Sequence, residues 1–481
     1  MAIMEKYQEK AREVFGEVCI DKSLVQKMGF ERNIPSYVAE WLIERHTPKG
    51  ELDHEAKTKI IGFINDHLPS KRQREFLRNK LLNGESIIIL DDFSVSIDLG
   101  SGRRNLKIPS LDIDNAYIEK HIVDNYPLLL CGGIWGAGKL IYHLKEEDLG
   151  KFGEKKVVGK ERGEIWLTDF RPMQIGKIDI DYYCESRSHF TLDEWRSLLL
   201  NSVGYNSNAF SPSQQHLLLA RLLPVVQNRI NLIELSPKGT GKSWIYINLS
   251  NYIRMVSGGK VTPAVLFYNN ATNVPGLLVK HDVVVLDECQ SISFENPGEV
   301  IGILKGFLEA GYFTRGKQKV TSEAGIVMLA NIPVESSGRP QSENLFQNLP
   351  EFLRETAFID RLHGILPGWD LPKFNSDMIA KGIGFKADFF AEVLHVLRDR
   401  TGYLEYIKNN CTIDSDSIRD KIAIWRLAAG LLKLLFPDLN VTQEELHEFC
   451  LKPAQSLRQR IRNQLALLDP EYKDLVITIN Y

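Results

Sequence analysis

Residues 236–243, which read SPKGTGKS, constrain the fold of this chain more than any other feature. They follow the apolar run NLIEL, which is typical of a buried strand, and they precede SWIYINLSNYI, which is typical of a helix. A glycine-rich loop between a strand and a helix directs backbone N–H groups and the helix N-terminus at one point, and phosphate binds there. The sequence therefore predicts a phosphate-binding loop made by Pro237, Lys238, Gly239, Thr240, Gly241, Lys242 and Ser243.

The ligands expected at this loop are ATP and Mg²⁺. Lys242 would reach the β- and γ-phosphate oxygens, and the hydroxyl of Ser243 would bind Mg²⁺. Ser236 stands where the motif usually begins with glycine. A second stretch, GIWGAGKL at residues 133–140, has similar spacing, but Leu140 replaces the metal-binding hydroxyl and the strand-like LIYHL follows it. We predict a β-turn there and no phosphate binding.

A second motif supports the nucleotide site. In the run DVVVLDE, four apolar residues are followed by Asp287 and Glu288, so a buried strand would present two carboxylates at the edge of a sheet. Asp287 is expected to hold Mg²⁺ through water, and Glu288 to polarise the attacking water. The alternative is a surface acidic pair at a strand end, which the loop upstream and the apolar run downstream disfavour.

Three further residues complete the predicted catalytic set of Lys242, Asp287, Glu288, Asn331, Arg361 and Arg419. Asn331 ends the apolar run GIVMLAN and could orient the lytic water. Arg361, in FIDRLHGILPGW, is expected to reach the γ-phosphate of a neighbouring subunit, and Arg419 to contact the nucleotide of its own chain. A surface salt bridge is the alternative for each arginine. The neighbouring His363 is expected to pack at a subunit interface.

The order of apolar runs predicts an α/β P-loop ATPase core of the AAA+ type, with a helical lid. NLIEL, AVLFYN, VVVLD and GIVMLAN are separated by helical lengths, the signature of a parallel sheet buried on both faces. The helix before the first of these runs is expected to cover SQQHLLLARLLPVVQN. The predicted segments are an N-terminal helical region at 1–83, a small antiparallel β domain (or a barrel) with a connector at 84–208, the core at 209–373, the lid at 374–440, and a helical tail at 441–481.

Composition excludes several other classes of protein. No segment reaches the roughly 18 uninterrupted apolar residues of a membrane span, and the start of the chain lacks the apolar centre of a signal peptide. The six cysteines include no C-x-x-C pair, which excludes the usual zinc spacings and indicates reduced thiols in the cytoplasm. The net charge of −3 means that any surface for nucleic acid would have to be local.

Basic residues cluster where a ring ATPase could contact DNA. AGYFTRGKQKVTSEAG predicts a β-hairpin carrying Arg315, Lys317 and Lys319, and SGGKVT predicts a second basic loop with Lys260. Alternating basic residues in a pore suit a phosphate backbone, and a solvated hairpin is the alternative. Basic patches at 71–80 and 103–107 would make the β domain a DNA collar.

Several of these stretches together, including NLIELSPKGTGKSWIY, GFLEAGYFTRGKQKV and FIDRLHGILPGW, resemble the BrxL family, the Lon-like AAA+ proteins of bacteriophage-exclusion (BREX) systems. The resemblance extends over most of the chain. It implies an anti-phage ATPase that forms hexameric or stacked hexameric rings, binds double-stranded DNA through its backbone and works with other BREX subunits. Longer relatives carry a C-terminal Lon-protease-like domain, and the roughly 40 residues after the predicted lid are too few for one.

Two classes of function stay open from the sequence. In one, ATP hydrolysis drives a ring along double-stranded DNA for translocation or remodelling. In the other, the chain is a Lon-like unfoldase subunit that remodels proteins without protease activity of its own. A serine nucleophile in a protease context is not evident after the lid, and the chain contains no G-x-S-x-G motif.

Overall fold

The computed structural model describes residues 2–29, 34–47, 52–130, 132–144, 163–173, 178–270, 274–315 and 318–481. The chain divides into two compact units, Met1–Ser23 with Lys177–Tyr481, and Leu24–Gly176. This division differs from the expected segments, because the helices that precede residue 83 belong to the same unit as the β domain that follows them, apart from the first. In the described part of the chain, no helix combines the length and the apolar character that crossing a membrane requires.

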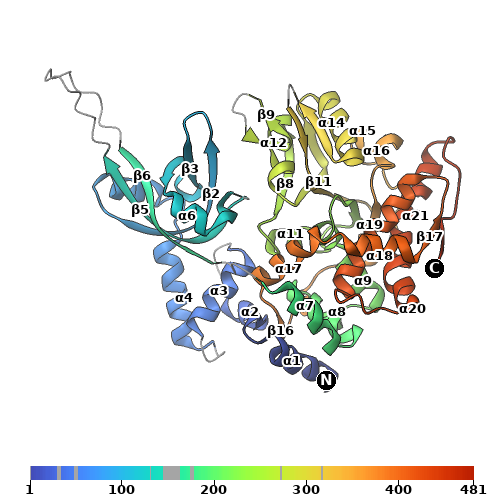
Figure 1. Ribbon diagram of the computed structural model, residues 1–481, viewed down its shortest axis with the longest axis horizontal. Helices are drawn as coiled ribbons and strands as arrows, with labels where there is room; N and C mark the ends of the chain where they lie inside the picture. Colours follow the sequence, from blue (N-terminus) through green and yellow to red (C-terminus); the bar gives the residue numbers. More distant parts are fainter. Residues whose placement is uncertain are drawn as a thin grey trace. The chain divides into compact units, whose positions relative to one another are not determined.

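The larger unit is built on a five-stranded parallel sheet in the order β15-β7-β14-β11-β8. Figure 1 labels two of its strands, β8 and β11. Its strands are β7 (Asn231–Ser236), β8 (Ile253–Val261), β11 (Val283–Phe294), β14 (Gly325–Asn331) and β15 (Gly364–Pro367). Every residue of β7 is buried, and so is all of β14 except Asn331. Such strands have helices on both faces, which explains their continuous apolar runs.

Two strands of this sheet differ from the prediction. AVLFYN, expected to be a strand, forms the helix α12 (Pro263–Leu266) and the short strand β9 (Tyr268–Asn269). The hydroxyl of Thr262 caps this helix and Pro263 occupies its first turn, a combination that favours a helix start. One edge strand is instead the preceding β8, in which only Ile253 and Val261 are buried, so it lacks the apolar signal of a central strand.

The predicted helix over SQQHLLLARLLPVVQN is broken into α9 (Pro212–Ala220) and α10 (Leu223–Val226). Pro224 explains the break, since proline has no N–H for a continuous helix ladder and prefers a first turn. The remaining helices of this unit are α1 (Ala2–Phe15), α7 (Ile180–Ser186), α8 (Leu192–Ser202), α11 (Lys242–Asn248), α13 (Leu277–Lys280), α14 (Pro297–Ala310), α15 (Glu351–Arg354) and α16 (Thr356–Ile359). The last third of the chain adds α17 (Ala387–Asp399), α18 (Gly402–Asn410), α19 (Ile418–Leu435), α20 (Gln443–Leu446) and α21 (Lys452–Leu468).

Helices from the predicted lid and from the predicted tail pack together, whereas α17 packs against α10 and α7. α19 packs against α18 and α21, and α21 lies against β15 of the sheet (Figure 1, orange to red). Short strands close the unit: β1 (Cys19–Asp21) with β16 (Ile383–Phe385), β9 with β10 (Val274–Pro275), β12 (Tyr312–Arg315) with β13 (Gln318–Thr321), and β17 (Thr412–Asp414) with β18 (Thr478–Asn480).

The smaller unit contains a closed five-stranded barrel in the order β2-β3-β4-β6-β5. Its elements are α2 (Ser23–Met28), α3 (Ser36–His46), α4 (His54–His67), α5 (Arg74–Leu82), β2 (Ile87–Asp98), β3 (Arg103–Ile108), β4 (Ile113–Ile118), α6 (Lys120–Asn125), β5 (Ile134–Leu144) and β6 (Gly163–Pro172). All pairings are antiparallel except that of β4 with β6, which is parallel, so the domain is not wholly antiparallel as expected.

The barrel accounts for the second P-loop-like stretch. Residues 134–140 of GIWGAGKL lie inside β5, so they form a strand and not the expected turn. A Cβ at Gly136 would come within 2.5 Å of the ring of Phe170, and one at Gly138 within 2.5 Å of the ring of Phe93. These glycines therefore let two aromatic rings fill the barrel, and their resemblance to a phosphate loop is coincidental.

Candidate nucleotide-binding site

The loop at residues 237–241 joins the C-terminal end of β7 to the first turn of α11. Gly239 and Gly241 have φ angles of +86° and +70°, and Gly241 is the N-cap residue of the helix. A side chain is disfavoured at such angles, which explains the two glycines. Lys242 is the first residue of α11 and Ser243 follows it, so both lie where backbone N–H groups have no partner within the helix.

Lys242 connects this loop to the neighbouring strand. Its Nζ donates a hydrogen bond of 2.6 Å to Oδ1 of Asn331, the last residue of β14. Asn331 pairs with Ser236, so the C-terminal ends of strands β14 and β7 lie side by side. Burial lowers the pKa of Lys242, while the charges of Glu234, Asp287 and Glu288 oppose that shift. Lys242 can therefore contact an anionic phosphate, and the nearby carboxylates can hold the Mg²⁺ that accompanies it.

Asp287 and Glu288 lie on β11, beside β14 in the sheet. Asp287 is 8% exposed, and its Oδ1 accepts a hydrogen bond of 2.9 Å from the backbone N–H of Glu288. Glu288 is exposed and has φ of +52°, an angle rarely adopted by residues other than glycine. The structure thus places Lys242, Asn331 and the two carboxylates at one edge of the sheet, the edge at which helix α11 begins.

A buried ion pair supports the loop, and sequence reasoning missed it. Nη2 of Arg221 donates to Oε1 of Glu234 across 2.6 Å, and both side chains are 1% exposed. The same guanidinium donates to the hydroxyl of Tyr205 (2.9 Å) and to the backbone carbonyl of Thr240 in the loop (3.4 Å). The only signal for this pair was the charged Glu234 in the middle of the apolar run NLIEL, because a buried charge requires a partner.

Gln290 is a second residue that the sequence did not single out. Its Oε1 accepts a hydrogen bond of 3.2 Å from the backbone N–H of Asn331. Gln290 lies three residues after Asp287 within β11, so this bond joins β11 to the end of the adjacent strand β14. It fixes the position of the asparagine to which Lys242 is bound.

Arg361 and Arg419 lie near the N-terminal end of β7, at the side of the sheet opposite to the loop. His363, just after Arg361, donates its backbone N–H to the carbonyl of Asn231 at the start of β7, whereas the loop follows the end of β7. The six residues of β7 separate these two edges by about 17 Å. Arg419 hydrogen-bonds to Asp360, the neighbour of Arg361, over 2.7 Å. Arg419 therefore does not lie beside the loop of its own chain, and its expected role there is not supported.

One carboxylate holds both arginines. Oε2 of Glu309 pairs with Arg361 at 2.7 Å, and Oε1 pairs with Arg419 at 2.5 Å. The hydrogen bond from Arg419 and the charge of Arg361 lower the pKa of Glu309. Both guanidinium groups are partly exposed and line a shallow cavity of about 90 Å³. Two cations gathered at one surface could bind an anion presented by another molecule.

A buried network fixes this arginine cluster to the C-terminal helices. Arg458 of α21 is 1% exposed and donates to Asp360 (2.8 Å) and to Asp420 (2.6 Å). Asp360 in turn accepts from Arg419. His363, expected at a subunit interface, is 5% exposed and its Nδ1 accepts from the backbone N–H of Asn231, so it lies within the chain.

The basic residues predicted to contact DNA lie in three settings. Arg315, at the end of β12, is close to Glu299 (3.5 Å) and donates to the carbonyl of Tyr268, so its charge is partly neutralised. Lys319 of β13 lies 4.4 Å from the ring centre of Tyr312 across the same hairpin. Lys317 lies outside the described residues.

Lys260 is not in a loop as predicted. It belongs to strand β8, where it pairs with Ser293 of β11 and its Nζ lies 3.5 Å from Glu295. The glycines that suggested a loop, Gly258 and Gly259, both have positive φ and are tolerated because β8 is an edge strand.

A parallel sheet with a glycine-rich loop, a lysine at a helix start and two carboxylates on a strand of the same sheet is the architecture of a P-loop ATPase domain. Comparison with known proteins agrees. Residues 165–478 match the family described as "Lon-like protease BrxL-like, ATPase domain", and residues 13–142 match "BREX system Lon protease-like protein BrxL N-terminal". The chain belongs to the BrxL family, which confirms the resemblance seen in the sequence.

Two relatives named "Lon-like protease BrxL" are each 29% identical to the chain. The relative from Bacillus cereus (strain H3081.97) aligns over 466 residues, which are 96% of this chain and 67% of the relative. The relative from Escherichia coli O9:H4 (strain HS) aligns over 452 residues, 93% of this chain and 63% of the relative. The chain therefore spans about two thirds of the length of these relatives.

Proposed function

We propose that this chain hydrolyses ATP at the loop between β7 and α11. The observation that carries the proposal is the hydrogen bond from Lys242 to Asn331, which places the lysine beside the strand that neighbours Asp287 and Glu288. Lys242 would bind the terminal phosphates, and Ser243 would ligate Mg²⁺ with Asp287 acting through water. Glu288 would accept a proton from the attacking water, which Asn331 would orient.

The Mg²⁺ assignment fits the residues present. Among the described residues there is no group of three or more His, Cys, Asp or Glu side chains that could enclose a metal ion. Mg²⁺ in nucleotide sites needs no such cage, because it retains waters and binds phosphate oxygens with one or two protein oxygens. Ser243 and Asp287 supply those oxygens at the start of α11 and at β11.

We infer that the active form is a ring, a hexamer or stacked hexamers. Arg361 and Arg419 lie at the sheet edge opposite to the loop of their own chain, so they could reach a phosphate only in a neighbouring subunit. Both would then act across the interface, which differs from the sequence-based assignment of Arg419 to its own nucleotide. Paired guanidinium groups stabilise the charge that builds up during phosphoryl transfer.

The substrate that we propose is double-stranded DNA, translocated or remodelled in BREX-type anti-phage defence in the cytoplasm, with other BREX subunits as possible partners. The hairpin of β12 and β13 carries Arg315 and Lys319 directly after α14, and Lys260 lies on an edge strand of the same unit. Basic residues at a hairpin suit contacts to phosphates that do not depend on sequence. The competing function is a Lon-like, ATP-dependent remodelling of proteins.

ATP turnover with different additives tests the choice between these functions. The purified chain is assayed with ATP and Mg²⁺ alone, with plain duplex DNA, and with an unfolded polypeptide at the same moderate salt concentration. We expect duplex DNA to raise the rate and polypeptide to leave it unchanged. Stimulation by polypeptide alone would establish the remodelling function instead, and absence of turnover under all three conditions would refute the ATPase assignment.

A further inference from the structure

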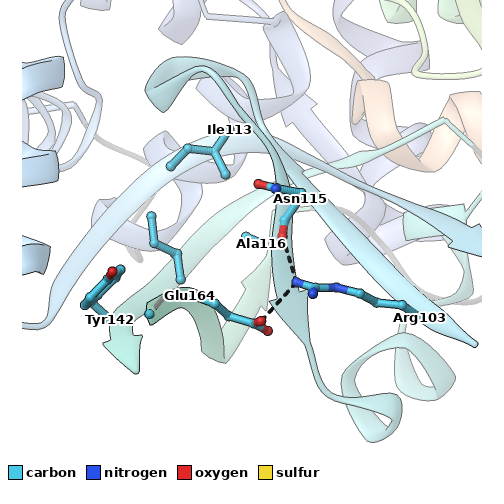
Figure 2. A pocket seen from close by; sticks show the side chains of 8 residues that line it. Arg103, Ile113, Asn115, Ala116, Tyr142 and Glu164 are labelled. Carbon is cyan, nitrogen blue, oxygen red and sulfur yellow. Dashed lines mark hydrogen bonds and ion pairs between the residues drawn. The ribbon is translucent and has the colours of Figure 1, made fainter. Parts of the chain in front are cut away.

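The barrel of the smaller unit contains a cavity that the proposed ATPase does not use. β4 and β6 pair only through Tyr117 with Trp166 and Ile118 with Leu167. Before these pairs the two strands separate, and a cavity of about 410 Å³ opens between them, lined on its apolar side by Ile113, Ile165 and Tyr142. Its volume lies within the range of small-ligand sites. Figure 2 shows the side chains that surround it.

The rim of this cavity carries both hydrogen-bond donors and acceptors. Arg103 crosses from β3 and donates to the carbonyl of Asn115 (2.9 Å), and its Nη2 lies 3.2 Å from Oε2 of Glu164 (Figure 2). Nε of Arg103 is buried and has no hydrogen-bond partner among the residues that the structure describes. This donor is therefore available to an acceptor on a ligand at the rim.

Three aromatic rings lie next to the rim, on β4, β5 and β6. Trp166 of β6 lies between two rings: Tyr117 of β4 at 4.2 Å and His143 of β5 at 4.8 Å. Tyr117 is two residues after Asn115, and Trp166 is two residues after Glu164, so these side chains share the outer face of the barrel with the rim. We call Tyr117, Trp166 and His143 the aromatic row.

Charge argues against a phosphate in this cavity. Arg103 is already paired with Glu164, and the carboxylate of Glu164 would repel an anion. The nearby Lys107 is also paired, with Asp114 at 3.3 Å. The surface favours a ligand that is flat, uncharged and able both to donate and to accept hydrogen bonds. An unpaired nucleobase has these properties, and its neighbours along a strand would find stacking partners on the aromatic row.

We propose that the barrel binds single-stranded nucleic acid, with one unpaired base in the cavity and an adjacent base stacked on an outer ring of the aromatic row, Tyr117 or His143, since Trp166 lies between them. The ligand differs from the duplex of the proposed function, because a duplex hides the faces and edges of its bases. The site is independent of the nucleotide loop, which belongs to the other unit. Such a site would hold a strand that becomes unpaired while DNA is remodelled.

Equilibrium binding of two labelled strands to the full chain, measured without ATP by fluorescence anisotropy, tests this proposal. One strand is a short DNA of mixed sequence, and the other has the same length and charge but lacks bases. Trp166→Ala removes the ring that holds Tyr117 and His143 in place, so it should weaken binding of the ordinary strand about tenfold, the range expected for loss of base stacking. Binding of the abasic strand should not change, and neither should the slope of affinity against salt, since the variant keeps every side chain that could bind a phosphate.

Two further variants keep the test decisive. His143 is exposed at the side of the aromatic row, so His143→Ala removes one of its rings with little risk to the barrel, and it should lower affinity for the ordinary strand alone. Phe76→Ala, on α5, removes an aromatic ring that is 60% exposed but outside the row, and it should leave both affinities unchanged. Thermal unfolding shows whether each variant is folded. Equal losses for both strands, or no loss in folded Trp166→Ala and His143→Ala, would overturn the proposal.

The side chains at the rim also predict which base the cavity prefers. Glu164 accepts hydrogen bonds and Arg103 donates them, a combination that matches the donor and acceptor edges of guanine. Homopolymer strands should therefore bind unequally, and Glu164→Gln should reduce any preference for guanine without changing binding of the abasic strand. Unaltered base preference in this variant would exclude the cavity and leave the row as the only contact.

Discussion

Lys242 and Asn331 are joined by a hydrogen bond of 2.6 Å between Nζ and Oδ1, which connects the first residue of α11 to the last residue of β14. Asn331 is held in turn by Gln290 of β11 through its backbone N–H. The lysine that would bind phosphate is thus positioned by the two strands on which the proposed catalytic side chains lie. Substitution of Asn331 or Gln290 should therefore affect Lys242 even where the substituted side chain does not touch a nucleotide.

Glu288→Gln should leave ATP binding intact and reduce hydrolysis at least a hundredfold, because general-base assistance contributes about 10²–10⁴ in rate. Lys242→Ala should instead weaken binding itself. Affinity for a fluorescent ATP analogue and the release of phosphate are measured separately for each variant. Lys139→Ala, in strand β5, is the control and should match the parent in both measurements. Normal turnover in Glu288→Gln would show that another group accepts the proton.

Arg361→Ala and Arg419→Ala should each lower hydrolysis while preserving ATP binding, since both residues would act on the phosphate of the next subunit. Mixing either variant with Lys242→Ala should restore part of the activity, because some interfaces then combine an intact lysine with intact arginines. Turnover is measured after mixing at several ratios and exchanging subunits. If Arg419→Ala alone weakened ATP binding and mixing failed to rescue it, Arg419 would act in its own chain.

The central strands and the loop could be predicted from the sequence, whereas the edges of the sheet could not. NLIEL, VVVLD and GIVMLAN are buried on both faces and therefore appear as apolar runs. Only the two terminal residues of β8 are buried, and β15 has four residues, so neither gives a clear apolar signal. Both strands are defined by backbone hydrogen bonds to their neighbours in the sheet, which side-chain patterns do not reveal.

Side-chain partners were similarly hard to predict. Arg419 and Arg361 are 58 positions apart in the sequence, and only the packing of α19 beside Asp360 brings them to the same carboxylate. The location of Arg419 depends on that tertiary contact, whereas the sequence shows only that it begins a helix. The loop residues were predictable because they are adjacent in the chain and their local geometry defines the site.

Arg458→Leu should destabilise the larger unit by about 3 kcal/mol, because Asp360 and Asp420 would each lose a buried guanidinium partner and retain Arg419 and Arg462, respectively. Chemical denaturation measures the free energy of unfolding. Lys452→Ala, at the start of the same helix, removes an exposed ion pair with Glu448 and should change stability by less than about 1 kcal/mol. Equal stability of Arg458→Leu and the parent would show that the acidic side chains find other partners.

The pair of His395 and Asp282 predicts a pH dependence of stability. Burial alone would lower the pKa of His395, but the hydrogen bond and charge of Asp282 outweigh it and raise that pKa above 6.5. The folded state therefore binds the proton more tightly than the unfolded state. The resulting stabilisation is complete below the unfolded pKa of about 6.5 and is lost as the pH rises through the higher folded pKa.

Unfolding in urea at several pH values checks this expectation. The stability of the parent relative to His395→Gln should decrease between about pH 6 and pH 8, because only the parent loses a charged pair over that range. A constant difference across the range would show that Asp282 does not favour the protonated imidazole.

The hairpin of β12 and β13 decides between DNA and polypeptide as the substrate of the proposed motor. Replacing Arg315, Lys317 and Lys319 with alanine should weaken binding of duplex DNA regardless of its sequence. It should also flatten the slope of log affinity against log salt by about 0.9 for each phosphate that the variant no longer binds. Because Arg315 is already close to Glu299, its share of this change should be smaller than that of Lys319. Lys452→Ala is the control for loss of a surface charge and should keep the parent's slope.

ATP turnover without DNA should stay near that of the parent, since the hairpin does not contain the proposed catalytic residues, while stimulation by DNA should disappear. A triple variant that keeps both affinity and slope would show that the hairpin is a solvated loop, and remodelling of polypeptides would then be the better account of the motor.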